Sequence, residues 1–518
     1  MTGPGLFLKA LFCLSSQSYG IAFRAKNYQP THAGVGGRSS TRICCGALKR
    51  SSTTKEASVE KKLPTEAPAV NRAVIDPSIT EWADRPLELD SWGKIMLKGL
   101  LFSELQQLMT NIGEKPGRAE ILCGWLYHSG RLVRDVEETS GANSGHGDSF
   151  QRHRIGWKTR ENIRACATAD GGLELEDVQL AADGTRKMVS ILTCGEGEGK
   201  KIETVIIPML RGPQRKPRYT VCVSSQVGCA MNCQFCYTGR LGLMAHLQTA
   251  QIVEQVISAK RYLESVGDPA PVSGVVFMGM GEPFDNYERV MRAVKILTDS
   301  RAGVRLKASK VTVSTVGLVP AIERFCTDPE NGASLAISLH TVSDEVRDQV
   351  IPINRRYPLG QLGDSLRKHF PRRPEPQPTW ISAERSESHC PDSVPALGFI
   401  PVPKKRRRVN RILAVEYTLM RGVNDSPADA ERLAEWLKGI SCVVNLITFN
   451  PHDGTPFSRS SVATLKAFRE VLLERGQLCT YRDSRGDDGM AACGQLGGES
   501  MHGRGTRPPV AVKWKPTV

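Results

Sequence analysis

The sequence predicts an α/β protein whose parallel sheet is covered on both faces and preceded by a small helical domain. Between residues 219 and 449, short apolar segments alternate with amphipathic ones. Apolar strands that alternate with helices indicate a parallel sheet buried on both faces. Polar motifs follow several of these segments, which favours a barrel with its active site at the carboxyl ends of the strands. A doubly wound open sheet fits the same periodicity.

Four segments precede the predicted core. Residues 1–55 contain eight Lys or Arg and no Asp or Glu, the composition of an organelle transit peptide. We expect a plastid address, with the mitochondrion second and a basic tail on a cytoplasmic protein third. Residues 56–95 have the composition of a linker, and in 96–140 apolar residues return every three or four positions, which predicts a helical domain. Residues 141–210 are predicted to be a β-rich connection.

The predicted core spans residues 211–498. Its six expected strands lie at 219–223, 274–279, 310–315, 334–340, 412–420 and 443–449. Helices are expected between them, including one at 426–440 that opens with a serine cap and a proline. The proline-rich stretch 371–410 predicts an inserted, disordered loop, and residues 499–518 form a basic tail.

The formal net charge of +15 is concentrated in two segments. Residues 1–55 carry +8 and residues 371–411 carry +5, so a basic total does not by itself indicate RNA binding. Local basic patches at 210–219 and 404–408 are candidate phosphate contacts, with solvated loops as an equal alternative. Fifteen cysteines fit a reducing compartment better than a disulfide framework. No apolar stretch is long enough to span a bilayer, which predicts no membrane association.

A cysteine motif begins at the end of the first core strand. Cys222, Cys229, Cys233 and Cys236 fall within fifteen residues, the last three with the spacing C-x3-C-x2-C. A four-iron cluster normally takes four thiolates, so three leave one iron open to another ligand. Structural zinc sites usually pair two ligand couples, and no second couple is visible. Zinc and a plain core role for these cysteines are the less favoured alternatives.

This motif is the signature of the radical S-adenosylmethionine (SAM) superfamily, and seven blocks of sequence resemble one family within it. In order they are CVSSQVGCAMNCQFCYTG, MGMGEPFDN, VTVSTVG, LAISLHTVSDEVRD, IPINRRYPL, NLITFNP and RGDDGMAACGQL. They resemble the RlmN-like adenine methyltransferases that act on ribosomal and transfer RNA. The resemblance implies a partial (βα)6 radical-SAM barrel with an N-terminal helical accessory domain that helps to grip RNA.

The resemblance also implies the residues of a site. Cys229, Cys233 and Cys236 would bind a [4Fe–4S] cluster whose open iron binds S-adenosyl-L-methionine. Further cofactor contacts are implied for Gly281, Glu282, Ser314, Ser338, Leu339, His340 and Asn450. Gly281 permits close approach of the backbone, and Glu282 is an acceptor for the ammonium group. Tyr237, where bacterial relatives often have a small hydroxyl residue, is expected to reshape the edge of the cofactor pocket.

Two further cysteines, Cys222 and Cys493, lie 271 positions apart. In the family, the residue matching Cys493 is methylated by one SAM, and a radical made from a second SAM activates that methyl group for addition to adenine. The residue matching Cys222 then attacks the Cys493 sulfur, and the disulfide bond so formed must later be reduced. Glu203 stands where the family places a proton acceptor. The glycines around Cys493 predict a flexible tail.

The resulting expectation is a radical SAM methyltransferase that makes 2-methyladenosine in 23S-type ribosomal RNA and in transfer RNA. It would work as a monomer and draw electrons from a ferredoxin- or flavodoxin-type donor. A carbon-8 adenine methyltransferase of the same family shares the cysteine set and is the nearest alternative. A non-catalytic iron–sulfur or zinc RNA-binding module is the other alternative, but it would need neither Cys222 nor Cys493.

Overall fold

The structure is a computed structural model that describes residues 83, 85–128, 130–140, 154–209, 216–372, 412–482 and 485–497. All of them belong to one compact unit, Val70–Val518. Outside the described residues lie the expected transit peptide, residues 56–82 of the linker, the insertion from residue 373 to 410, the patch 404–408, most of the patch 210–219 and the tail 499–518. Every helix within the described ranges is too short or too polar to cross a bilayer.

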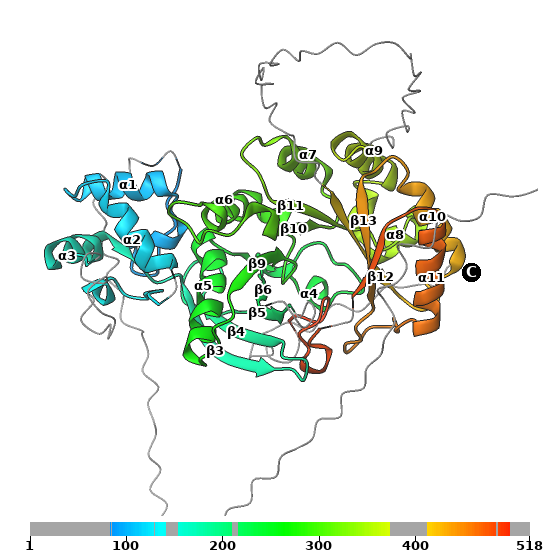
Figure 1. The fold of residues 1–518 in the computed structure, drawn as a ribbon, viewed down its shortest axis with the longest axis horizontal. Coiled ribbons are helices and arrows are strands. Elements are labelled where there is room, and N and C mark those ends of the chain that lie inside the picture. Colours follow the sequence, from blue (N-terminus) through cyan, green and yellow to red (C-terminus); the bar gives the residue numbers. More distant parts are fainter. Residues whose placement is uncertain are drawn as a thin grey trace, which may run out of the picture. The chain divides into compact units, whose positions relative to one another are not determined.

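Ten strands of the described residues form one mixed sheet (Figure 1). Its spatial order is β14-β13-β12-β11-β10-β9-β6-β5-β4-β3. The strands are β3 (Leu173–Leu180), β4 (Arg186–Leu192), β5 (Lys201–Pro208), β6 (Tyr219–Cys222), β9 (Val272–Phe277), β10 (Val311–Thr315), β11 (Ser334–Ser338), β12 (Leu413–Leu419), β13 (Cys442–Thr448) and β14 (Cys479–Arg482).

Within this sheet the strands from β6 to β14 are parallel, and each lies beside the next strand of the sheet along the chain. A doubly wound sheet reverses its strand order at a switch point, so this order excludes that alternative. The antiparallel strands β3 to β5 continue the sheet beyond β6 and leave it open. The predicted partial barrel is confirmed, with six strands at the expected positions and β14 as a seventh parallel strand that the sequence analysis missed.

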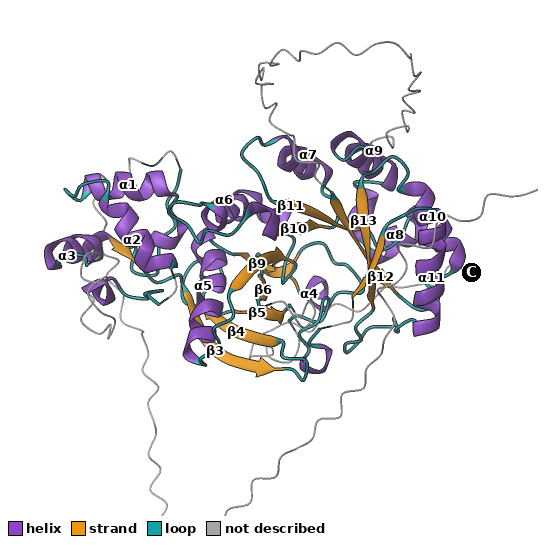
Figure 2. Ribbon diagram, in the orientation of Figure 1, coloured by secondary structure: helices purple, strands orange, loops and turns teal. Residues whose placement is uncertain are grey.

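Helices connect the parallel strands, as expected from the alternating pattern. They are α5 (Thr249–Ser265), α6 (Tyr287–Thr298), α7 (Val319–Thr327), α8 (Asp344–Val350), α9 (Leu359–His369), α10 (Pro427–Trp436) and α11 (Val462–Glu474). Figure 2 shows most of them outside the strands, on the side away from the short helix α4 (Tyr237–Arg240). The predicted cap of α10 is present, because the Ser426 hydroxyl accepts the backbone N–H of Asp429 at 3.2 Å.

The helical part before the core is longer than expected. It contains α1 (Phe102–Asn111), α2 (Arg118–Tyr127) and a third helix, α3 (Trp157–Cys166), which lies in the segment expected to be β-rich. The short strands β1 (Ile95–Met96) and β2 (Ala167–Thr168) pair in parallel and bring the two ends of this part together. The apolar face of α3 consists of a few residues such as Ile163 and Cys166, too few to give a clear helical period in the sequence.

A buried ion pair joins this helical part to the core. The Lys98 ammonium lies 2.5 Å from a carboxylate oxygen of Glu254 on α5, and both side chains are almost fully buried. Burial alone would raise the pKa of Glu254, but Lys98 and Arg261 hold it below its usual value. The helical part is therefore fixed to the helix that follows the cysteine motif.

Candidate active site

A cavity of about 700 Å³ opens at the carboxyl ends of the parallel strands. Of the site residues predicted from the sequence, those that line it are Cys222, Cys229, Cys233, Cys236, Gly281, Glu282, Ser314, Ser338, His340, Asn450 and Cys493. They come from five strand ends and from two loops far apart in the sequence. The topology thus brings the predicted cluster ligands, the predicted cofactor contacts and the two outlying cysteines into one cavity.

Two predicted residues are not among those that line the cavity. Glu203 on β5 is fully buried and pairs with Lys187 at 3.4 Å, while its other carboxylate oxygen accepts the N–H of Gly497 at 2.9 Å. The Leu339 side chain packs in the apolar core, and its backbone N–H donates to the Glu416 carbonyl at 3.1 Å. Sequence position alone does not give the direction of these side chains.

The three predicted cluster cysteines lie on a hairpin that was not among the strands expected from the sequence. The strands β7 (Gln226–Cys229) and β8 (Gly242–His246) pair antiparallel beside the main sheet. Gly228 adopts a left-handed φ of +73°, and a Cβ there would lie 1.9 Å from the carbonyl oxygen of Gly242. Glycine is therefore required one residue before Cys229 for the hairpin to close.

The three thiols of this hairpin are well shielded from water. Cys229 and Cys233 are buried and Cys236 is half-buried. Burial raises the pKa of all three thiols. Backbone N–H groups oppose this effect: that of Met231 at Cys229, and those of Gly239 and Thr238 at Cys236. N–H groups directed at a sulfur stabilise a negative charge on that sulfur.

This donor set fits an iron–sulfur cluster. Hydrogen bonds to the sulfurs and low solvent exposure are the usual protein contributions at such clusters, and positive metal charge would offset the desolvation of three thiolates. No group of three or more His, Cys, Asp or Glu side chains within the described ranges converges tightly enough for a single metal ion. The thiolates of a four-iron cluster bind different irons, so they need not converge on one point.

The loop after β9 supplies the predicted cofactor anchors. Gly281 has a φ of +99°, and a Cβ there would lie 2.6 Å from the side chain of Gln226. The Glu282 carboxylate accepts the backbone N–H groups of Phe284 and Val316, each at 3.0 Å. Burial raises the pKa of Glu282 to about 7. An ammonium group bound in the cavity would favour the ionised form.

Further polar groups follow the next two strands. The hydroxyls of Ser314 on β10 and Ser338 on β11 are 3.5 Å apart. His340 adopts a left-handed φ of +58°, and its Nδ1 accepts the backbone N–H of Thr418 at 2.9 Å. Burial lowers the pKa of His340 to about 3, so the ring is neutral and its proton lies on Nε2. That N–H is the donor His340 can offer to a ligand.

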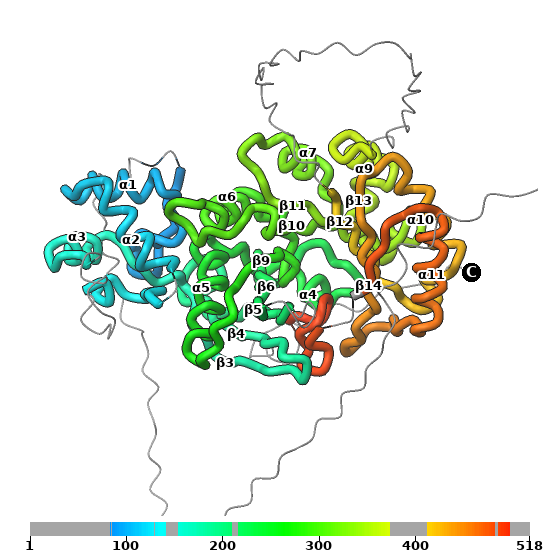
Figure 3. The backbone as a smooth tube through the Cα atoms, viewed as in Figure 1, coloured from blue at the N-terminus to red at the C-terminus, as the bar shows by residue number. Residues whose placement is uncertain are grey.

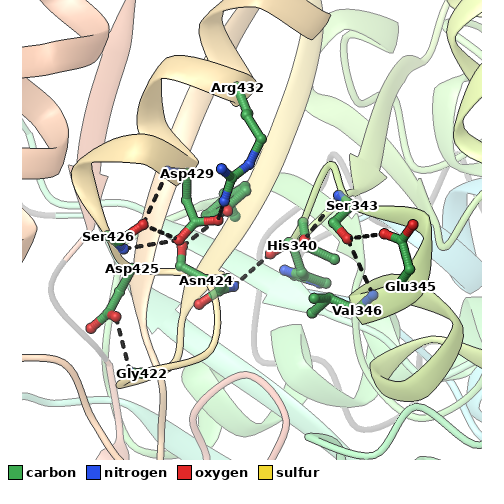
Figure 4. Close-up of polar contacts among 12 residues, drawn as sticks. His340, Ser343, Glu345, Val346, Gly422, Asn424, Asp425, Ser426, Asp429 and Arg432 are labelled. Carbon is green, nitrogen blue, oxygen red and sulfur yellow. Dashed lines mark hydrogen bonds and ion pairs between the residues drawn. The ribbon is translucent and has the colours of Figure 1, made fainter. Parts of the chain in front are cut away.

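Asn424 holds His340 in this conformation, as Figure 4 shows. Its side-chain amide donates to the carbonyl oxygens of His340, at 2.5 Å, and of Thr418, at 2.8 Å. Its amide oxygen accepts the N–H of Met420 at 2.7 Å. The ring of His340 also packs edge-on against Phe235, between the cluster cysteines, with 4.6 Å between centroids.

The loop that carries Cys493 docks on the core. Figure 3 shows the C-terminal segment, in red, beside α4 and β5. The Cys493 carbonyl accepts the amide of Asn450 at 3.0 Å, and the Gly494 carbonyl accepts the N–H of Tyr237 at 2.8 Å. Between residues 491 and 497, Cys493 is the exposed residue among buried or half-buried neighbours. The glycines predicted flexibility, but hydrogen bonds from distant residues hold this segment.

The expectation for Tyr237 was wrong. Its ring is buried and packs edge-on against His452, with 5.6 Å between centroids, and it is not among the residues that line the cavity. A Cβ at Gly497 would lie 3.6 Å from the Tyr237 ring, so the ring lies beside the docked tail rather than at the edge of the cavity.

Three comparisons with known proteins agree with this geometry. Residues 223–359 match the family model of the radical SAM superfamily. The crystal structure of a radical SAM methyltransferase from Sphaerobacter thermophilus matches with a TM-score of 0.62 and 34% identity, over 77% of this chain and 98% of that chain. The dual-specificity RNA methyltransferase RlmN of Gluconobacter oxydans (strain 621H) is 35% identical over 427 residues, 81% of this chain and 89% of the relative. This chain belongs to the RlmN family.

The sequence analysis missed a buried cation below the site of this RlmN-family chain. Arg347 on α8 is almost fully buried and donates to the carbonyl oxygens of Val316, Ser338 and Leu339 at 2.7, 3.3 and 3.2 Å. It also donates to the side chain of Asn354 at 2.8 Å. Arg347 thus fixes the chain just after the two strands that carry Ser314 and Ser338. The only signal in the sequence was its place in the matched block LAISLHTVSDEVRD.

The raised pKa of Glu282 predicts a pH effect on stability before SAM is added. Because the folded-state pKa lies above the unfolded value of 4.5, the folded state binds this proton more tightly, and stability falls as the pH rises through about 7. Relative to Glu282→Gln, the wild type should lose roughly 3 kcal/mol of unfolding free energy between about pH 4 and pH 8. Urea unfolding across this range measures the difference.

Glu161→Gln, at an exposed carboxylate on α3, is the matched control and should follow the wild type. A constant offset between Glu282→Gln and the wild type at every pH would contradict the raised pKa.

Proposed function

We propose that this chain is a radical SAM RNA methyltransferase that methylates carbon 2 of adenine in 23S-type ribosomal RNA and in transfer RNA. One observation carries the proposal: Cys222 and Cys493, from opposite ends of the core sequence, line the same cavity as the three cluster cysteines. A binding module has no use for two further thiols at that position.

The proposed cofactors are a [4Fe–4S] cluster on Cys229, Cys233 and Cys236, and SAM on the polar strand ends. When bound, they supply a methyl group and a deoxyadenosyl radical. Glu282 is placed to accept the ammonium group, and the Nε2–H of His340 and the hydroxyls of Ser314 and Ser338 are placed to donate to polar oxygens of the cofactor. Asn450 and residues of the docked tail, to which Asn450 is hydrogen-bonded at Cys493, line the same cavity.

Adenine carbon 2 is electron-poor and has no nucleophilic lone pair, so direct polar transfer of a methyl cation is disfavoured. In the proposed reaction the Cys493 sulfur carries the one-carbon unit to the base and is joined to it through a thioether. The adduct first loses the carbon-2 proton and one electron, which would return to the proposed cluster. The Cys222 thiolate then attacks the Cys493 sulfur, the electron pair of the sulfur–carbon bond passes to the released carbon, and that carbon takes up a proton to become the methyl group as a disulfide forms between the two cysteines. An external reductant must restore both thiols.

Loss of the proton from carbon 2 requires a base, and Glu203 is the proposed acceptor. Its carboxylate is buried behind the docked tail, where the N–H of Gly497 occupies one of its oxygens. In this conformation Glu203 supports the tail, so proton transfer to it requires movement of Gly497.

The proposed chemistry predicts a different defect in the reaction for substitution of each of the two outlying cysteines. Cys493→Ala should abolish methylation, because no sulfur remains to carry the carbon. Cys222→Ala should leave RNA covalently attached to the protein, because nothing releases the thioether. Mass spectrometry of nucleosides from RNA incubated with each variant, and denaturing gels for the adduct, measure these outcomes.

Cys326→Ala, on α7 and not among the cavity residues, is the control and should retain activity. Formation of 8-methyladenosine in place of 2-methyladenosine would favour the carbon-8 alternative, since the same cysteines serve either reaction. Full methylation by Cys493→Ala would favour the non-catalytic RNA-binding module.

We also propose delivery to a plastid and electron supply by a ferredoxin- or flavodoxin-type donor. The basic, acid-free composition of residues 1–55 supports the first. Fusion of residues 1–55 to a fluorescent protein should direct it to plastids. Uniform cytoplasmic fluorescence, equal to that of the unfused reporter, would contradict the address.

A further inference from the structure

A single ion pair contacts both ends of the segment that carries Cys493. Lys187 on β4 and Glu203 on β5 lie 3.4 Å apart, with side chains that are 4% and 0% exposed. The Lys187 ammonium also donates to the carbonyl of Met490 at 3.2 Å. The other oxygen of Glu203 accepts the N–H of Gly497 at 2.9 Å. One member of the pair therefore holds the chain three residues before Cys493, and the other holds it four residues after.

Because these two charges are buried, hydrogen bonds from the tail take the place of water around them. A buried ion pair is tolerated only when its remaining donors and acceptors are also hydrogen-bonded. Here the backbone of the tail supplies one acceptor to the ammonium and one donor to the carboxylate. Undocking of the tail would remove both, so docking of the tail and satisfaction of the pair are coupled.

A second set of contacts holds the start of the segment to the turn between β3 and β4. The N–H of Ala182 donates to the Asp488 carboxylate at 2.9 Å, and the N–H of Gly486 donates to Asp183 at 3.2 Å. These contacts lie outside the part that carries the thiol. Residues 490 to 497 therefore depend on the Lys187–Glu203 pair and on Asn450 and Thr238 of the cavity wall. The backbone N–H of Tyr237 and the carbonyl of Pro451 hold the same segment from outside the cavity.

We propose that Lys187 and Glu203 are positioning residues that form a clamp, docking the Cys493 loop with its thiol toward the cavity. Release of the clamp would free the loop and uncover Glu203, which Gly497 now covers next to the cavity residue Leu496. The same carboxylate would then hold the loop in one state and face the substrate in the other. The catalytic meaning of the clamp rests on the proposed role of Cys493.

Hydrogen–deuterium exchange of the full chain, prepared anaerobically and without RNA or SAM, tests the clamp directly. Lys187→Met keeps the aliphatic stem but removes the ammonium. We expect the backbone amides of residues 490–497 to exchange at least roughly tenfold faster in this variant, because a hydrogen bond to a charged group is lost. Lys187→Arg, which keeps the charge, should restore most of the protection.

The matched control is Lys201→Met, which removes a more exposed ion pair, Lys201 with Glu176 at 2.7 Å, from the same sheet. It should leave exchange of residues 490–497 at the wild-type rate. A general weakening of the sheet would accelerate exchange in β4 and β5 in both variants, whereas the clamp predicts an effect confined to the tail of Lys187→Met.

Glu203→Gln gives an independent reading if Lys187→Met does not fold, because the amide keeps the size of the side chain and only its charge is lost. Its tail should also exchange faster than that of the wild type. Wild-type exchange of residues 490–497 in Glu203→Gln, or in folded Lys187→Met, would overturn the clamp. Failure of wild-type protein to methylate RNA would overturn the proposed function and leave this result intact, since exchange is measured without RNA.

Discussion

Desolvation of three neighbouring thiols is the constraint on which the rest of the site depends. Cys229, Cys233 and Cys236 lie in a cavity where burial raises the pKa of each thiol, so thiolates are disfavoured there without positive charge. The chain meets part of that cost with backbone N–H groups aimed at two of the sulfurs. The [4Fe–4S] cluster implied by the family would supply positive charge for the remainder, and three protein ligands would leave one of its irons free for another ligand.

The parallel topology explains how residues far apart in sequence reach the same cavity. The strands β6, β9, β10, β11 and β13 end at one edge of the sheet, and residues at or just after their ends, such as Glu282, Ser338 and Asn450, line the cavity. Buried polar groups then fix those strand ends. Arg347 binds carbonyls just after β10 and β11, and Asn424 holds His340 in a left-handed conformation that a histidine rarely adopts.

Cys222 and Cys493, the two proposed catalytic cysteines, are held in different ways. Cys222 is part of β6, where it pairs with Val205 and Val276 on the neighbouring strands. Cys493 lies on a segment without regular strands or α-helix, fixed by side chains from the core. A rigid resolving thiol and a docked, releasable carrier suit a sulfur that must meet first a methyl donor and then a base.

Much of the fold followed from the sequence, because apolar strands alternate with amphipathic helices and the cysteine spacing is distinctive. The site residues that follow strands, such as Glu282 and His340, could be placed for the same reason. What could not be predicted depends on tertiary packing. The Glu203 carboxylate points to the tail rather than into the cavity, and the Tyr237 ring lies beside that tail. The glycines near Cys493 do not reveal that residues far away in the sequence hold this segment by hydrogen bonds.

The central claim is that the three buried thiols bind a cluster with one open iron. Mössbauer and iron–sulfide analysis of anaerobically prepared protein, with and without SAM, tests it most directly. We predict about four irons and four sulfides per chain, one iron site whose signal changes when SAM is added, and loss of the cluster in Cys233→Ala but not in Cys222→Ala. Protein without iron and sulfide, or a cluster in which the Mössbauer signals of all four iron sites stay the same when SAM is added, would contradict the account.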